Sequence, residues 1–171
     1  MKLIGVLIVL ISAWGFGSSL IQKMNQQEKQ LFAFREMIDL FSAEIQYGRT
    51  PLKEACLQIS LRMQEPYCSI LNTIAQELDK QQFYSFECIW REAFAKAQKE
   101  FLLSEEGLEL LYGLGKYLGI LDKEAQLRHM QQYAIQVDHL LQQLQKGASE
   151  KKKVYRSVSL MVGAMVILLF I

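Results

Sequence analysis

The C-terminal end of the chain carries the sequence feature that most constrains its fold. No charged residue occurs from Ser157 to Ile171, and the chain ends in Val-Ile-Leu-Leu-Phe-Ile. Counted from Val154, the apolar segment has roughly 18 residues, or about 27 Å as a helix, which matches the hydrocarbon core of a bilayer. A basic flank precedes it, made of Lys151, Lys152, Lys153 and Arg156. Because such cations stay on the cytoplasmic side, the pattern predicts a membrane helix within 151–171 whose basic end faces the cytoplasm.

The N-terminal end has the same character. Leu3 to Ile21 is uncharged, and its roughly 19 residues are again enough for one crossing. The cations around it are Lys2 on one side and Lys23, Lys29 and Arg35 on the other. A membrane helix is therefore predicted over 1–22, and the positive-inside rule places the residues that follow it in the cytoplasm.

A cleaved secretory signal is the alternative for this N-terminal segment. Lys2 would be its basic start, Leu3 to Ile11 its apolar run, and the small residues of 15–19 its cleavage region. The protein would then be an exported helical bundle held by its C-terminal anchor. The uncharged run is longer than the apolar region of a usual signal, which favours a retained membrane helix.

Between the apolar ends, roughly 130 residues remain, which is enough for one domain with its own core. We predict this domain over 23–150, on the cytoplasmic side of the cell membrane. The net charge of the chain is +1, so no field strong enough to recruit nucleic acid is expected. The basic flank can attract membrane lipids with anionic head groups at about 1 kcal/mol per cation. Cys56, Cys68 and Cys88 suit small buried apolar positions in a reducing cytosol better than a disulfide framework.

Every segment of the predicted domain has the periodicity or the boundary signals of a helix. The expected helices are 26–47, 51–63, 66–79, 86–101, 104–118 and 123–146. We expect Thr50 to cap the second helix with its hydroxyl, Pro51 to occupy its first position, and Asp122 to cap the last helix. The predicted fold class is all-α: a bundle of about six helices flanked by an N-terminal and a C-terminal transmembrane helix.

Two of these helices carry long apolar stripes. The stripes are Leu31, Phe34, Ile38, Phe41 and Ile45 in the first helix, and Leu127, Met130, Ala134, Val137, Leu141 and Leu144 in the last. Polar residues, including Gln30 and Gln126, are expected outside the stripes. A sustained spacing of three and four residues is typical of a helix that packs along one partner. We therefore predict that the two helices pair antiparallel as a stalk, or that both stripes face a common core; the two interpretations are compatible.

Candidate catalytic and metal-binding residues are few. His129 and His139 are ten residues apart on one expected helix, which separates them by about 15 Å along the axis, too far to share a metal ion. Gly113, Gly115 and Gly119 fall inside or at the end of a helix rather than after a strand, so no phosphate-binding loop is expected. The sequence predicts no enzyme, no cofactor and no metal site.

Two passages carry a resemblance to a known family. The first is Phe41-Ser-Ala-Glu-Ile-Gln-Tyr-Gly-Arg-Thr-Pro-Leu-Lys-Glu-Ala55, and the second is Leu111-Tyr-Gly-Leu-Gly-Lys-Tyr-Leu-Gly-Ile-Leu-Asp-Lys-Glu-Ala-Gln126. They resemble the stage III sporulation protein AB family, membrane proteins of endospore-forming bacteria, and the similarity covers the whole chain. Leu121 departs from the small polar residue that the family has before the aspartate. The family's helical domain is similar to the cytoplasmic domain of the inner-membrane platform protein of type II secretion and type IV pilus machines.

The resemblance implies a part in the transenvelope channel between mother cell and forespore. The protein would sit in the mother-cell membrane as an assembly component, near a secretion-type ATPase and other channel proteins, and could form homo-oligomers. The candidate partner-contact or turn residues are Glu44, Tyr47, Gly48, Thr50, Pro51, Asp122 and Glu124. A sharp turn between helices is the plainer explanation for most of them. A membrane-anchored adaptor or sensor unrelated to secretion is the other function that the sequence leaves open.

Overall fold

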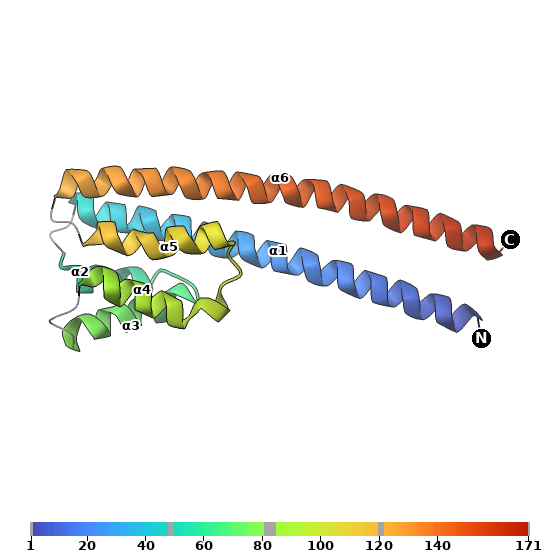
Figure 1. Ribbon diagram of the computed structural model, residues 1–171, viewed down its shortest axis with the longest axis horizontal. Coiled ribbons are helices and arrows are strands. Elements are labelled where there is room, and N and C mark those ends of the chain that lie inside the picture. The colour runs from blue at the N-terminus through green and yellow to red at the C-terminus, as the bar shows by residue number, and fades with distance from the viewer. Residues whose placement is uncertain (1, 48–49, 81–84, 120–121, 171) are drawn as a thin grey trace. The chain divides into compact units, whose positions relative to one another are not determined.

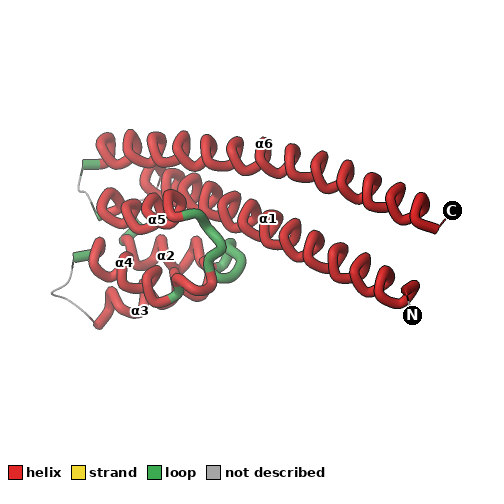
Figure 2. Tube along the Cα trace, turned by 45° about the vertical axis from the view of Figure 1, so that its right-hand side comes forward, coloured by secondary structure: helices red, strands yellow, loops and turns green. Residues whose placement is uncertain are grey.

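All regular secondary structure in the described part of the chain is helical. A computed structural model describes residues 2–47, 50–80, 85–119 and 122–170, with side chains described between residues 22 and 147. The helices are α1 (Lys2–Tyr47), α2 (Leu52–Ser60), α3 (Tyr67–Lys80), α4 (Phe86–Lys96), the short 3-10 helix η1 (Gln98–Glu100), α5 (Glu105–Leu118) and α6 (Lys123–Phe170) (Figure 1). No strand occurs in these residues (Figure 2), so the predicted all-α class is confirmed.

The chain divides into two compact units. One consists of Met1–Glu28 together with Gln142–Ile171, and the other of Lys29–Leu141. In the first unit, the side-chain amide of Gln145 donates to the Glu28 carboxylate at 2.9 Å. Among the residues that the structure describes, no helix has the length and hydropathy that a bilayer crossing requires. The predicted membrane segments, 1–22 and 151–171, lie almost wholly where helical backbone but no side chains are described, so they stay predictions.

In the second unit, α1 and α6 run antiparallel. The Arg35 guanidinium of α1 donates to the Asp138 carboxylate of α6 at 3.1 Å, and also bonds to Asp39 on its own helix. Near the other end of the pair, the Lys123 ammonium at the start of α6 donates to the Gln46 carbonyl at the end of α1, at 2.7 Å. The predicted antiparallel pairing is therefore confirmed for the parts of both helices that belong to this unit.

An aromatic core holds the shorter helices against α1. Trp90 of α4 is fully buried, with its ring centroid 5.9 Å from that of Phe41 on α1 and 4.7 Å from that of Phe94. Its indole N–H donates to the Leu111 carbonyl of α5 at 2.8 Å, so the polar group is satisfied inside the core. On α3, the Tyr67 hydroxyl donates to the Gln30 carbonyl of α1 at 3.0 Å. These contacts join α3 and α4 to α1, and α5 to α4.

Of the two caps predicted from the sequence, Asp122 is confirmed and Thr50 is not, and Ser104 is a further cap. The Ser104 hydroxyl accepts from the Gly107 N–H at 3.2 Å at the start of α5, and the Asp122 carboxylate accepts from the Glu124 N–H at 3.1 Å at the start of α6. The prediction for Thr50 is wrong, because Pro51 rather than Thr50 occupies the N-cap position of α2 and no side chain caps that helix. The Thr50 hydroxyl instead lies against a carboxylate of α1, described below.

Three predicted helix ends also differ from the structure. α2 ends at Ser60, although Met63 beyond it is still buried. α4 ends at Lys96 instead of continuing to Phe101, because the chain passes through η1 and then turns Phe101 into the core. There the Phe101 ring packs edge-on against Tyr67, with centroids 5.3 Å apart. The last helix continues past residue 146 to the end of the described chain.

The predicted stripes form most of the core that α1 and α6 contribute. Leu31, Phe34, Ile38, Phe41, Met130, Ala134, Val137 and Leu141 are buried, whereas Ile45, Leu127 and Leu144 are half-buried. The stripes are wider than expected, because Met37 and Leu140 are buried as well. Gln30 and Gln126, predicted to lie outside the stripes, are buried too. Both are buried with their amides hydrogen-bonded to backbone groups, which removes the cost of desolvating them.

Candidate partner-binding groove

The first family passage surrounds the end of α1 and the start of α2. Glu44 is half-buried near the end of α1, and its carboxylate accepts a hydrogen bond from the Thr50 hydroxyl at 3.1 Å. This contact ties the chain that leaves α1 back to the helix, so Thr50 helps to set the turn rather than the cap of α2. Tyr47 ends α1 with its side chain 84% exposed. Gly48 lies outside the described residues.

The second family passage surrounds the end of α5 and the start of α6. Asp122 caps α6, and the buried Gln126 amide donates to the Leu118 carbonyl at the end of α5, at 2.6 Å. Lys123 reaches across to α1, where it satisfies the Gln46 carbonyl. Glu124 points to solvent, 3.8 Å from the Arg128 guanidinium. Leu121, which departs from the family pattern, lies outside the described residues.

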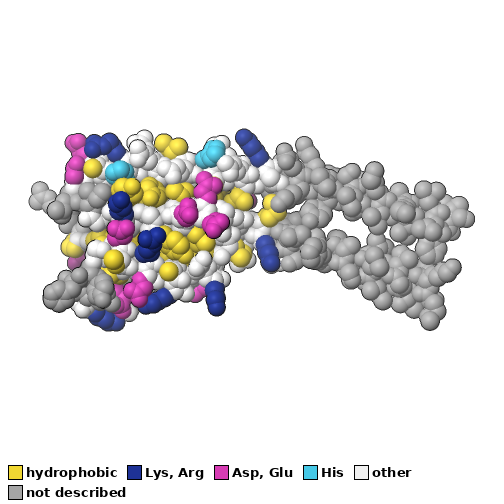
Figure 3. Space-filling view, in the orientation of Figure 1, with side chains coloured by type: hydrophobic (Ala, Val, Ile, Leu, Met, Phe, Trp, Pro, Cys, Tyr) yellow, Lys and Arg dark blue, Asp and Glu magenta, His cyan; other side chains and the backbone are white. Residues whose placement is uncertain are grey.

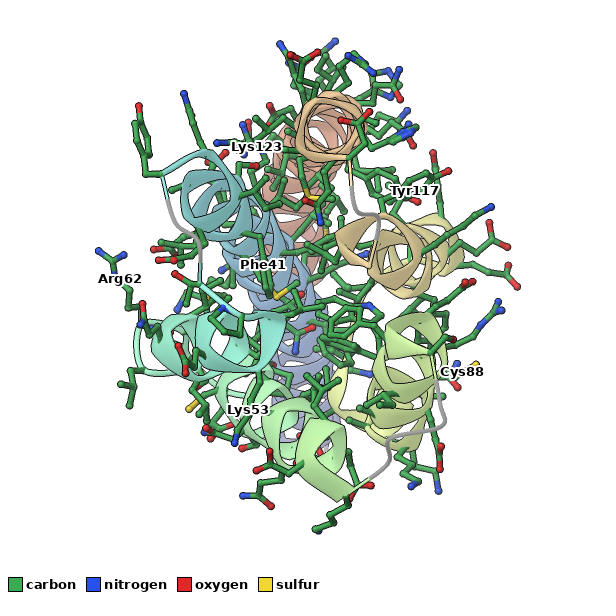
Figure 4. The ribbon with its side chains drawn as sticks, turned by 90° about the vertical axis from the view of Figure 1, so that its left-hand side faces the viewer. Phe41, Lys53, Arg62, Cys88, Tyr117 and Lys123 are labelled. Carbon is green, nitrogen blue, oxygen red and sulfur yellow. The ribbon has the colours of Figure 1, made fainter. Side chains whose placement is uncertain are left out.

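These two helix junctions together enclose a groove of about 410 Å³. It is lined by Phe41, Glu44, Ile45, Thr50, Leu52, Ala55, Leu118, Gly119, Lys123 and Gln126. Every one of these residues belongs to one of the two passages that carry the family resemblance. Figure 4 looks at this end of the bundle, with Lys123 on α6 and Phe41 on α1. Two stretches that are far apart in the sequence therefore build one concave surface.

The groove combines apolar walls with one charge of each sign. Phe41, Leu52 and Leu118 supply apolar surface, Glu44 supplies a carboxylate and Lys123 an ammonium group. On the face of the molecule drawn in Figure 3, charges of both signs are scattered among hydrophobic side chains rather than gathered into one block. The arrangement suits recognition of a protein segment better than recognition of a strongly charged polymer.

The candidate partner-contact or turn residues coincide with the groove lining only in part. Of the candidate contact residues, Glu44 and Thr50 line it, whereas Tyr47, Pro51, Asp122 and Glu124 are absent from its described lining. Lys123 and Gln126 line the groove but were not among the candidate residues, although both belong to the second passage, as do Asp122 and Glu124. The predicted membrane-flanking cations Lys151, Lys152, Lys153 and Arg156 are in α6, where side chains are not described.

The remaining residues whose side chains could take part in catalysis or bind a metal are histidines and cysteines. His129 stacks on Tyr117 with ring centroids 4.1 Å apart. No group of three or more metal-ligating side chains is found in the described part of the chain. Cys56 is buried, as predicted, and burial raises the pKa of its thiol to about 12. The same prediction is wrong for Cys88, which is exposed in the first turn of α4, and Cys68 is half-buried.

Comparison with known proteins finds the same family that the two passages resemble. A family model for Stage III sporulation protein AB matches residues 2–171. The Stage III sporulation protein AB of Bacillus subtilis (strain 168) is 24% identical over 169 residues, covering 99% of this chain and 98% of the relative. A solved structure of a Stage III sporulation protein AB has a TM-score of 0.66 at 23% identity, over 72% of this chain and 97% of that chain, and shows a shared fold. Because the family match spans nearly the whole sequence, this chain belongs to the stage III sporulation protein AB family.

Proposed function

We propose that this protein is a membrane-anchored, non-enzymatic assembly component of the transenvelope channel between mother cell and forespore. It acts as a secretion-type inner-membrane platform that links a cytoplasmic ATPase to the channel. The observation that carries the proposal is the groove, because both passages that mark the family converge on it. A concave surface formed by two helix junctions that are far apart in the sequence is a suitable contact site for another protein of the assembly.

The proposed location is the mother-cell membrane, with the helical domain in the mother-cell cytoplasm. The support is the charge pattern of the two uncharged ends: the basic flank of 151–156 precedes one end, and three cations follow the other by residue 35. Both counts assign the intervening residues to the same side, as two crossings require. The basic flank would also hold anionic lipid head groups.

Cys88 provides a direct test of this topology, since its thiol is exposed in the folded bundle. A membrane-impermeant maleimide applied to intact sporulating cells should leave Cys88 unlabelled. The same reagent should label Cys88 after the cells are permeabilised, which is the positive control. Labelling in intact cells would contradict a cytoplasmic domain, and loss of roughly the first 19 residues from the native protein would show that the N-terminal segment is a cleaved signal.

The groove is tested by filling it. Leu52→Trp places a larger side chain on the groove wall, whereas Leu61→Trp adds the same side chain at an 85% exposed position outside the groove lining. In cells that rely on the variant, we expect Leu52→Trp to lower spore yield by at least about tenfold, the effect of a disrupted contact hot spot. Leu61→Trp should leave the yield unchanged, with both variants at wild-type abundance.

A photo-crosslinking residue at position 52 identifies the partner in the same cells. Trapping of the secretion-type ATPase or of a channel protein is expected. Normal spore yield from Leu52→Trp, together with no trapped channel protein, would favour the adaptor or sensor unrelated to secretion.

A further inference from the structure

Two connections between the shorter helices lie at the same level of α1 in the second unit. They are the turn 61–66 between α2 and α3, and the loop 97–104 that contains η1 (Figure 2). The loop is held on α1 by the side-chain amide of Gln30, which bonds to two of its backbone groups. The turn leads directly into Tyr67, whose hydroxyl donates to the Gln30 carbonyl at 3.0 Å. Because the second unit begins at Lys29, both connections lie where the chain enters it, and we call this end of the unit the Gln30 end.

The chain continues from the Gln30 end into both segments for which membrane crossings are predicted. Residues 23–29 alone separate Gln30 from the predicted segment 1–22, which amounts to about 12 Å as a helix and at most about 29 Å fully extended. Residues 142–150 alone separate the second unit from the predicted segment 151–171. Head groups cover each face of the hydrocarbon core to a depth of about 5–8 Å. If the two segments cross a bilayer, the Gln30 end therefore lies close to the lipid surface.

The Gln30 end exposes two leucines that the core of the bundle does not use. Leu61 is 85% exposed in the turn, and Leu102 is exposed in the loop, whereas their neighbours Met63, Phe101 and Leu103 are buried. A single exposed leucine is ordinary on a protein surface. These two leucines, however, lie at the end of the bundle that the predicted anchors hold near lipid, which is where an exposed leucine can leave water.

Exposed cations accompany the leucines. Arg62 follows Leu61 in the turn, Lys99 belongs to the loop, and Lys29 lies at the same level of α1. The ion pairs found among the described residues include none of these three cations. Phosphate groups, which every phospholipid head group contains, are suitable partners for arginine and lysine at a membrane surface.

The carboxylates at the same end are largely offset within the protein. Glu65 accepts from the Ser69 N–H at 3.3 Å and also from the Ser69 hydroxyl. Glu105 and Glu106 occupy the first turn of α5, where the positive end of the helix offsets their charge. Glu100 is the remaining carboxylate of the loop. The charges that this end leaves for an outside partner are therefore mainly positive.

We propose that the Gln30 end rests on the lipid surface of the membrane, with Leu61 and Leu102 among the head groups and Arg62 and Lys99 bound to lipid phosphates. This contact holds the bundle in one orientation over the membrane, so that the groove, at the other end of α1, faces away from lipid. The inference rests on the proposed membrane location, because the anchors bring this end to the bilayer.

Fluorescence quenching of the full-length protein in lipid nanodiscs tests the contact. Cys56, Cys68 and Cys88 are replaced by alanine, and one new cysteine at a time is labelled with bimane. The nanodiscs contain an equal mixture of phosphatidylcholine and phosphatidylglycerol, with some lipids that carry a nitroxide quencher on the head group. Leu61→Cys and Tyr47→Cys are a matched pair, because the two original side chains are 85% and 84% exposed.

We expect the nitroxide lipids to quench the probe at position 61 at least about twofold more than the probe at position 47, because about 25 Å of α1 separates Tyr47 from the level of Gln30. Equal quenching at the two positions, or stronger quenching at position 47, would overturn the proposal.

A second measurement tests the two leucines. The probe is placed at Gln64→Cys, an exposed position in the same turn. Leu61→Asp combined with Leu102→Asp should lower its lipid quenching at least about twofold, because a carboxylate does not enter the interface as leucine does. Ile135→Asp, at an exposed position on α6, is the control and should leave the quenching unchanged. Quenching that survives the double substitution, in a protein of unchanged circular dichroism, would contradict the role of the leucines.

The two cations are tested with the same probe at position 64. Arg62→Gln combined with Lys99→Gln should lower the lipid quenching by roughly twofold, and high salt should reduce the difference from wild type. Unchanged quenching in this variant would overturn the assignment of the two cations to lipid phosphates.

The lipid contact and the proposed function can fail separately. Leu61→Trp should keep the contact, since tryptophan is enriched at membrane interfaces, and so it remains a control for the groove. If Leu52→Trp abolishes spore formation but positions 61 and 47 are quenched equally, the lipid contact is wrong and the assembly role stands. If position 61 is quenched selectively but Leu52→Trp leaves spore yield normal and no channel protein is trapped, the lipid contact stands and the assembly role is wrong.

Discussion

Gly115 of α5 lies directly against the Trp90 indole of α4. A Cβ atom built on Gly115 would be 2.5 Å from the Trp90 Cγ, well inside van der Waals contact. Glycine at this helical position therefore allows α4 and α5 to approach closely enough for the indole N–H to reach the Leu111 carbonyl. The close approach, rather than any unusual backbone conformation, is the reason for a glycine in the middle of a helix.

Gly115→Ala should consequently destabilise the bundle, although alanine is the better helix former. We expect the free energy of unfolding to fall by about 1–3 kcal/mol, the usual cost of forcing extra volume into a packed core. Denaturant unfolding of the purified protein measures it. Gly119→Ala is the control, because a Cβ there meets Phe86 at an ordinary 3.6 Å, and its stability should change little. An unchanged Gly115→Ala would show that Trp90 can move aside.

Gln30 is expected to contribute strongly to stability through two backbone hydrogen bonds. Its amide donates to the Glu100 carbonyl at 2.8 Å and accepts from the Leu102 N–H at 2.7 Å, holding η1 and the following loop on α1. Gln30→Ala leaves both backbone groups without this partner, so we expect a loss of about 2–4 kcal/mol in thermal or denaturant unfolding. The exposed Gln131→Ala should be near neutral; an equal effect of the two substitutions would contradict the role of Gln30.

The starts of α5 and α2 allow a comparison between a side chain that caps its helix, Ser104, and one that was predicted to do so but does not, Thr50. Ser104→Ala removes a side-chain cap from α5 and should lower stability by about 1 kcal/mol. Thr50→Ala removes only the partly exposed hydrogen bond to Glu44, since no side chain caps α2, and should cost about 0.5 kcal/mol or less. Unfolding curves of the two variants, measured under the same conditions, give the two losses of stability. A larger loss of stability for Thr50→Ala than for Ser104→Ala would mean that the turn after α1 governs the folding of this end of the bundle.

Cysteine reactivity should separate the buried from the exposed thiol. Burial raises the pKa of Cys56 to about 12, whereas Cys88 is exposed. At pH 8 we expect iodoacetamide to modify Cys88 readily and Cys56 only after denaturation, as counted by mass spectrometry of the digested protein. Rapid modification of Cys56 in the native protein would show that α2 opens frequently.

The same pKa shift gives a pH dependence of known sign. The usual pKa of a cysteine thiol is 9.0, so between pH 9 and about pH 12 the unfolded chain releases this proton while the folded chain retains it. The free energy of unfolding should therefore decrease as the pH rises through this window and be unaffected by Cys56 below it. Cys56→Ala should show a shallower decrease above pH 9 than wild type. Parallel slopes for the two proteins would contradict the shift.

The local sequence determined the helices and many of their boundaries, because these depend on residues close together in the chain. The apolar spacing of Leu31, Phe34, Ile38 and Phe41 predicts a buried face, and Ser104 and Asp122 are caps that act within a few residues. The family resemblance was also readable in the sequence, since it consists of contiguous residues. The two membrane segments were also predicted from contiguous residues, and they stay predictions.

Only the tertiary structure decided which polar residues are buried and where the groove lies. Gln30 and Gln126 can be buried because backbone groups outside their own helices satisfy their amides, which the residue spacing within one helix does not reveal. Likewise, the groove exists because α1 and α6 run antiparallel and so bring Glu44 and Lys123 to one surface. The spacing of residues within one helix cannot specify which residues of different helices lie close together, because that depends on how whole helices pack.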